Sequence, residues 1–178
     1  LQAVGSLTGN ADVLSGIGLI TIVSDDLLTL GAGVNIQSAA DISLRSNNAA
    51  ILMEGTATVT ATDSVLRIAA GDTLTLGDLT ATTVSLVADG QIVNAAGSTL
   101  NVSADALRIS SAGAIGAATR HLTVDIVTLA AYAENDGLFL SAQNAVTVAP
   151  VTTVVSELTS SAGSTTLTDG ALNHLTAL

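Results

Sequence analysis

The groups in this 178-residue sequence that could do chemistry are mostly carboxylates, because fifteen acidic residues stand against four arginines. Asp41 and Asp63 lie 22 residues apart, Asp25 and Asp26 are adjacent, and Asp136 closes a Glu-Asn-Asp triplet. Oxygen-rich turns of this kind can bind Ca²⁺. They are also typical of solvated turns in which Asp suits the backbone, and we favour that interpretation over a cofactor.

A histidine and an aspartate supply the pattern closest to an acid–base pair. His121 follows Arg120, and Asp125 comes four residues later, as in a site that could cleave a polysaccharide. Such sites normally gather several acids and bases, and this chain has no lysine. Nucleophile-elbow, phosphate-loop and zinc-ligand spacings are also missing. We therefore expect these residues, and also His174 near the carboxyl end, to be exposed turn residues. We also expect that the chain is not an enzyme.

The arginines recur in similar surroundings. Arg67 in VLRIA and Arg108 in ALRIS each lie between two aliphatic residues that would point inward, so both arginines should point outward. Arg45 precedes Arg67 by 22 residues, and the two would stack if the chain repeats with that period, with Asp41 and Asp63 as counter-ions. Exposed ion pairs of this kind contribute little to stability.

Tyr132 and Phe139 are the candidate ligand-binding residues, because they are the only aromatic side chains. A sugar-binding surface usually stacks aromatic rings against the sugar, and these two lie seven residues apart. The alternative is that one or both fill a locally wider part of the core.

The elements that must position these groups are short strands. Apolar residues at i, i+2 spacing mark strands with one buried face, as in DTLTLGDLTATTVSL from 72 to 86. Every third apolar pair recurs after 22 to 24 residues, as from Ile20 to Ile42 to Leu66. The rhythm slips near Leu79 and returns from Val84 onward. The sequence therefore contains a repeat of three strands.

Three short strands in about 22 residues predict one coil of a parallel β-helix, and the chain is long enough for roughly eight coils. An antiparallel sandwich is the alternative, but it has no reason to keep the three-strand period. One Phe, one Tyr and no Trp suit a narrow interior filled with small aliphatic residues. Neither end resembles a cap, so we expect residues 1–178 to be one segment of a longer solenoid.

Charge and hydropathy exclude several partners. A net charge of −11 argues against nucleic acid and anionic lipid, which bind lysine and arginine. The apolar runs are far shorter than the roughly 20 residues needed to span a bilayer. The absence of cysteine excludes disulfides and thiolate-bound metal.

Residues 113–148 contain the phrases G-x-I-G, L-T-V, V-T-L-A-A and G-L-F-L-x-x-x-x-A-V-T-V, and GDTLTL and AADISL have the same character. This resembles the repeats of giant bacterial surface proteins of the filamentous-haemagglutinin-like class of adhesins. The resemblance implies a right-handed parallel β-helix in a very long secreted or cell-surface protein that serves adhesion or forms an extracellular filament. The amino-terminal secretion module of that class and glycine-aspartate nonapeptides are not found here.

We therefore expect a structural or adhesive segment of an extracellular bacterial surface protein. Its expected partners are neighbouring solenoid segments, copies of itself, another cell or a polysaccharide. The alternatives from other classes are a carbohydrate-active β-helix enzyme and a Ca²⁺-dependent assembly module.

Overall fold

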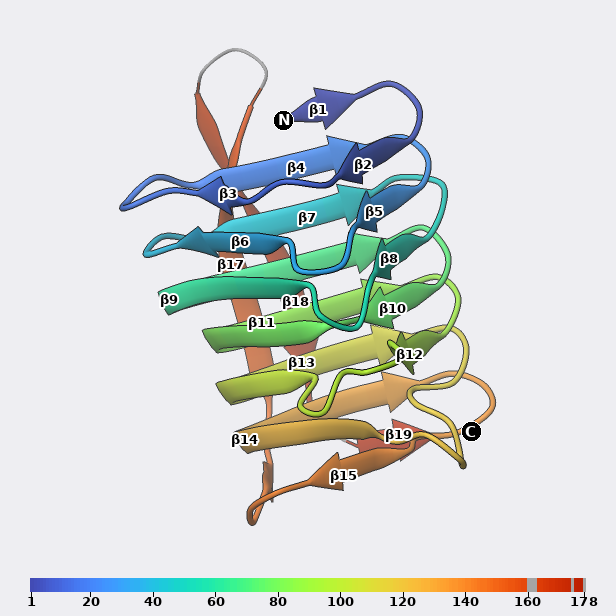
Figure 1. Ribbon diagram of the computed structural model, residues 1–178. Helices are drawn as coiled ribbons and strands as arrows, with labels where there is room; N and C mark the ends of the chain where they lie inside the picture. The colour runs from blue at the N-terminus through green and yellow to red at the C-terminus, as the bar shows by residue number, and fades with distance from the viewer. Residues whose placement is uncertain (160–162, 174, 178) are drawn as a thin grey trace.

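The computed structural model describes residues 1–159, 163–173 and 175–177, and this part of the chain is all-β (Figure 1). It contains no helix that is long and apolar enough to cross a membrane. The chain winds into a β-solenoid of about seven turns, which confirms the predicted parallel β-helix. The strands of the first three turns are β1 (Gln2–Ala3), β2 (Leu7–Gly9), β3 (Val13–Leu14), β4 (Ile20–Ser24), β5 (Leu28–Leu30), β6 (Asn35–Ser38), β7 (Ile42–Ser46) and β8 (Ile51–Met53).

Longer strands form most of the remaining turns, where the sequence predicted separate short ones. Each long strand passes around a corner of the solenoid and contributes to two successive turns, because the parallel pairing continues through the corner. The strands that follow β8 are β9 (Thr58–Ala70), β10 (Leu74–Leu76), β11 (Asp78–Ala88), β12 (Ile92–Asn94), β13 (Val102–Ser111), β14 (Leu122–Ala133) and β15 (Leu140–Ala142).

Two parallel sheets surround the core. The larger follows the order β1-β4-β7-β9-β11-β13-β14-β15, and the smaller follows β12-β10-β8-β5-β2. The predicted aliphatic columns are confirmed, because Ile20 pairs with Ile42 and Ile42 with Leu66. Ile42 and Leu66 are fully buried. Aliphatic side chains stacked in this way fill the interior without aromatic rings.

The slip near Leu79 is a shortened fourth turn. Leu66 pairs with Val84, only 18 residues later, because Gly77 alone joins β10 to β11. A Cβ on Gly77 would lie 2.3 Å from the carbonyl oxygen of Ala57, so no larger residue fits without backbone movement. Beside this shortened connection the third and fifth turns come into contact, because a Cβ on Gly55 would clash with the backbone carbonyl of Ala96.

Asn101 lies next to this shortened connection and is fully buried. Its Nδ2 donates to the carbonyl oxygen of Leu76 at 3.2 Å and to Oδ1 of Asn94 at 3.1 Å. Its Oδ1 accepts from the backbone N–H of Thr123 at 3.0 Å. One side chain therefore holds three successive turns together.

The residues after the seventh turn form a hairpin instead of a complete eighth turn. β16 (Thr147–Val148) and β19 (Leu175–Ala177) both pair in parallel with the second half of β14, so they are two pieces of one interrupted rung. Between them, β17 (Val151–Leu158) and β18 (Ser164–Leu172) form an antiparallel pair. This hairpin runs across the coils and contacts strands of several successive turns (Figure 1). The solenoid therefore has about seven turns where the repeat predicted roughly eight.

Candidate functional site

Asp41 joins the solenoid to the hairpin. Its Oδ1 accepts from the hydroxyl of Ser64 at 2.5 Å and from the N–H of Val65 at 3.2 Å. Its Oδ2 accepts from the N–H of Ser156 in β17 at 2.8 Å. Burial acts to raise the pKa of Asp41, but these hydrogen bonds outweigh it, and the pKa lies below its ordinary value. The carboxylate that the sequence offered as a metal ligand therefore serves as a clamp.

Asp63 does not stack on Asp41, because the register between the third and fourth turns is 24 residues instead of 22. Ile42 pairs with Leu66, which places Val65 beside Asp41. One of the two additional residues lies in the turn between β7 and β8, and the other lies in the corner inside β9, where Asp63 is exposed and has a left-handed φ of 53°. Asp is one of the few residues that adopt this conformation readily. The conformation of the corner is therefore sufficient to account for an aspartate at position 63.

The other acidic candidates lie in turns at one edge of the solenoid. Asp25 Oδ1 accepts from Asn47 Nδ2 at 2.7 Å, and the carbonyl oxygen of Asp26 accepts from the hydroxyl of Ser46 at 2.6 Å. Asp136 is exposed, with a left-handed φ of 63°. Within residues 1–159, 163–173 and 175–177, no three His, Asp or Glu side chains converge on a metal position.

The acid–base candidates have separate partners. His121 stacks on Phe139 with ring centroids 6.1 Å apart and an interplanar angle of 22°. Asp125 Oδ1 accepts from Asn144 Nδ2 at 2.7 Å. The second aromatic candidate, Tyr132, lies half-buried in β14, between strands β13 and β19. The two aromatic residues thus belong to different segments of the last coil. His174 lies outside the described residues.

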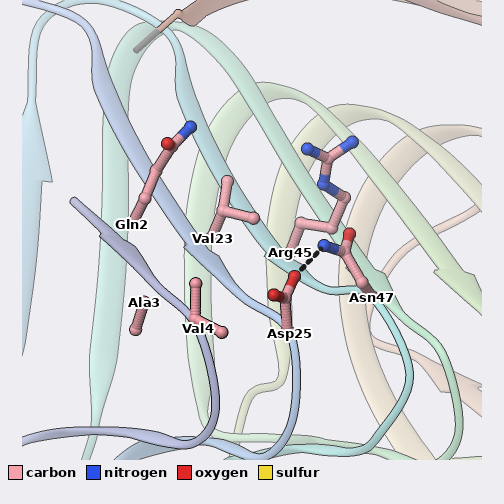
Figure 2. A pocket seen from close by; sticks show the side chains of 7 residues that line it. All are labelled: Gln2, Ala3, Val4, Val23, Asp25, Arg45 and Asn47. Carbon is pink, nitrogen blue, oxygen red and sulfur yellow. Dashed lines mark hydrogen bonds between the residues drawn. The ribbon is translucent and has the colours of Figure 1, made fainter.

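A shallow pocket lies where β1 runs beside β4 and β7 (Figure 2). Val23, Asp25, Arg45 and Asn47 line it together with residues of β1. Figure 2 shows Asn47 turned toward Asp25, while the guanidinium of Arg45 points away from both. Arg45 pairs with Val23 and Ala69 and therefore does not stack over Arg67, contrary to the 22-residue expectation.

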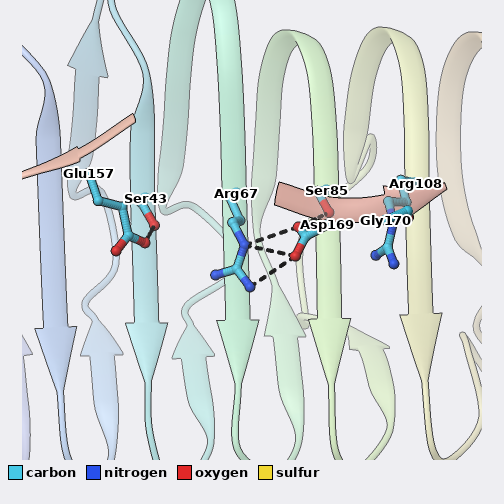
Figure 3. Close-up of polar contacts among 7 residues, drawn as sticks. All are labelled: Ser43, Arg67, Ser85, Arg108, Glu157, Asp169 and Gly170. Carbon is cyan, nitrogen blue, oxygen red and sulfur yellow. Dashed lines mark hydrogen bonds and ion pairs between the residues drawn. The ribbon is translucent and has the colours of Figure 1, made fainter. Parts of the chain in front are cut away.

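A cluster of buried polar side chains lies under the hairpin (Figure 3). Successive turns place one outward-facing column along the sheet, and the hairpin covers it. The column consists of Thr21, Ser43, Arg67, Ser85, Arg108 and Ala130. Val155 and Glu157 of β17 are buried against this face. The predicted outward direction of Arg67 and Arg108 is confirmed, but both are covered and not free in solvent.

Asp169 of β18 is the centre of this cluster. Arg67 donates to both of its oxygens, from Nε at 3.0 and 3.1 Å and from Nη2 at 3.1 Å. The hydroxyl of Ser85 donates to Oδ2 at 2.6 Å. Burial acts to raise the pKa of Asp169, but the bonds from Arg67 and Ser85 and the charge of Arg108 outweigh it, so the pKa is lowered.

Two further contacts extend the cluster along the hairpin. Arg108 Nε donates to the carbonyl oxygen of Gly170 at 2.9 Å, and the hydroxyl of Ser43 donates to Glu157. Burial lowers the pKa of Arg108, the charge of Asp169 acts to raise it, and that of Arg67 lowers it further. The carboxylates of Glu157 and Asp169 thus both point toward the outer face of the solenoid sheet (Figure 3).

This arrangement is suited to holding two elements together. A general base needs a carboxylate that can accept a proton near neutral pH, and the bonds to Asp169 and Asp41 work against protonation. Sequence analysis missed Asp169 and Glu157 because their partners lie about 100 residues away. The available signal was the pair of outward-pointing arginines in equivalent surroundings, Arg67 in VLRIA and Arg108 in ALRIS.

Comparisons with protein-family models, with curated proteins and with solved structures gave no match to this chain.

Proposed function

We propose that this chain is a structural and adhesive segment of a large extracellular bacterial surface protein or filament. The observation that carries the proposal is the set of buried polar contacts that fix the hairpin to the solenoid. Arg67, Arg108 and Asp169, three mostly buried ionisable groups of the polar cluster under the hairpin, hold β17 and β18 along a seven-turn rod. A rod of seven coils at about 4.8 Å per coil is roughly 30 Å long.

Surface charge supports the same role. With a net charge of −11, segments of this kind repel one another and stay dispersed. They can approach one another only where their surfaces carry no charge. The exposed turns at Asp26, Asp136 and their neighbours carry much of that charge. The chain then acts as a spacer that presents surface to another cell or to a polysaccharide.

An adhesion assay tests this proposal. Microspheres coated with the folded chain should adhere to cell layers or immobilised polysaccharides more strongly than microspheres coated with heat-unfolded chain. Equal retention of both would remove the adhesive part of the proposal. Small-angle scattering would show independently whether the chain behaves as a rigid rod in solution.

The same protein preparation separates the two alternative functions. Release of reducing ends from a polysaccharide, lost in both His121→Ala and Asp125→Asn variants, would replace the structural role with an enzyme. A fall in melting temperature on addition of EDTA, reversed by Ca²⁺, would favour the assembly module. We expect neither effect, because Asp41 already accepts hydrogen bonds from Ser64 and Ser156, and Asp125 accepts one from Asn144.

A further inference from the structure

β18 has one edge that pairs with β17 and a second edge that faces outward. β17 and β18 form a two-stranded sheet. The N–H groups of Ser156 and Leu158 in β17 donate to solenoid side chains and therefore point away from β18. Thr166 and Ser164 lie directly opposite these two residues. In an antiparallel ladder, opposite residues share one orientation, so Thr166 and Ser164 direct their N–H and C=O groups away from β17.

This outer edge is accessible and uncharged. Ser164, Thr166 and Thr168 are all exposed. The only carboxylates in the described part of the hairpin, Glu157 and Asp169, point toward the outer face of the solenoid sheet. Edge strands are usually protected by charge, proline or a covering element, and the described residues of this edge show none of these. It is therefore a suitable site for the addition of another strand.

We infer that this edge pairs with the β18 edge of a second copy of the chain, antiparallel about Thr166. The two hairpins then form one four-stranded sheet that joins two rods side by side. With Thr166 on the twofold axis, Ser164 of each copy meets Thr168 of the other, and such hydroxyl pairs are favourable across strands. Val154 and Leu158, which are 50% and 44% exposed, lie next to the contact on the same hairpin.

Charge favours a second copy over other occupants. Two chains that each carry −11 repel wherever their acidic turns approach each other. The hairpin edge is a place where both copies can meet without bringing carboxylates together. This contact rests on the proposed filament role and adds a partner surface to it, and self-association can be measured on the isolated chain. Failure of self-association would therefore leave the rod and adhesion assays unaffected.

Molar mass by light scattering, followed from low to high protein concentration, tests the contact. We expect a concentration-dependent rise to twice the monomer mass. Thr166→Asp places like charges on the twofold axis and should abolish that rise, whereas Thr152→Asp, on the exposed face of β17, should preserve it. A chain that stays monomeric at all concentrations would overturn the inference and leave the edge for a different strand. Equal loss of the dimer in both variants would also overturn it.

A crosslink makes the geometry itself testable, because the chain has no cysteine. Opposite residues in such a pair have Cα atoms about 5.5 Å apart, within the range of a disulfide. Thr166→Cys should therefore form disulfide-linked dimers at least about tenfold faster than Thr152→Cys under mild oxidation. Hydrogen exchange of the hairpin amides would confirm that the hairpin stays docked in both variants. Equal crosslinking rates would contradict pairing about Thr166.

Discussion

Asp169→Asn should loosen the hairpin while leaving the solenoid wound. The substitution keeps the shape of the side chain but removes its charge and one acceptor oxygen. Arg67, which donates to both oxygens of Asp169, would keep its charge under the hairpin without a carboxylate. Arg108 would lose the same favourable field. The hydroxyl of Ser85 can rotate to accept from the new amide, so packing is preserved and the loss is mainly electrostatic.

The expected size follows from burial. The side chains of Arg67 and Asp169 are 12% and 10% exposed, so water replaces their interaction only in part. Removing one partner of a buried pair costs about 3–5 kcal/mol, and the residual exposure places this pair near 3 kcal/mol. At 1.4 kcal/mol for each factor of ten, the open population of the hairpin should rise by roughly 150-fold.

Native-state hydrogen exchange measures that population. The amides of Ser156 and Leu158 report docking, because they donate to Asp41 and Thr21 across the interface. Their exchange should accelerate in Asp169→Asn, while core amides of the solenoid stay protected. Asp136→Asn is the matched control, since that carboxylate is exposed in a turn outside the interface. Rates within about threefold of the parent, equivalent to less than 1 kcal/mol, would refute the assignment of Asp169 as the residue that fixes the hairpin to the solenoid.

Three further predictions follow from the same structure. The pKa values of Asp41 and Asp169 are lowered, so the stability that these carboxylates contribute is complete above the ordinary value of 3.8 and is lost as the pH falls through their lower folded values. Hydrogen exchange of the hairpin amides during an acid titration should show this loss. A hairpin whose exchange does not respond to acid would contradict it. Asn101→Ala should lower the free energy of unfolding by about 2–3 kcal/mol in urea denaturation, because it leaves buried backbone groups in neighbouring turns without partners. Leu86→Asp should lower the free energy of unfolding by about 3–5 kcal/mol because it buries a charge, whereas Thr83→Asp, at an outward-facing position, should change the urea midpoint little. Equal effects of the two substitutions would contradict the assignment of Leu86 to the core.

The solenoid was predictable from the sequence because its core depends on a local pattern that recurs. The pairs at Ile20 and Ile42 and at Leu28 and Ile51 are adjacent in space as their spacing indicated. Aliphatic residues at i and i+2 lie on the same face of a strand, so they point together into the core. The length of the repeat then determines which strands are neighbours. The slip near Leu79 was also visible, since a turn that loses residues must shift every later pair.

Corners and the hairpin could not be predicted in the same way. The number of residues in a corner depends on backbone conformation that the apolar pattern does not report. One residue added between β7 and β8 and one added in the corner around Asp63 moved the expected Arg45 stack out of register. The alternation from Val151 to Glu157 suits a strand inside the coil as well as one outside it. Only the long-range partners of Asp169 distinguish the two, and no repeat encodes them.

The interrupted rung has a consequence for how this surface can change. Because Leu175 resumes on the same neighbouring strand that Val148 left, everything between them is added sideways and does not alter the pitch of the winding. Evolution, or an engineer, can lengthen or exchange that arm without re-threading the column of aliphatic residues beneath it. The molecule thus separates the winding that sets its length from the hairpin that lies along its side.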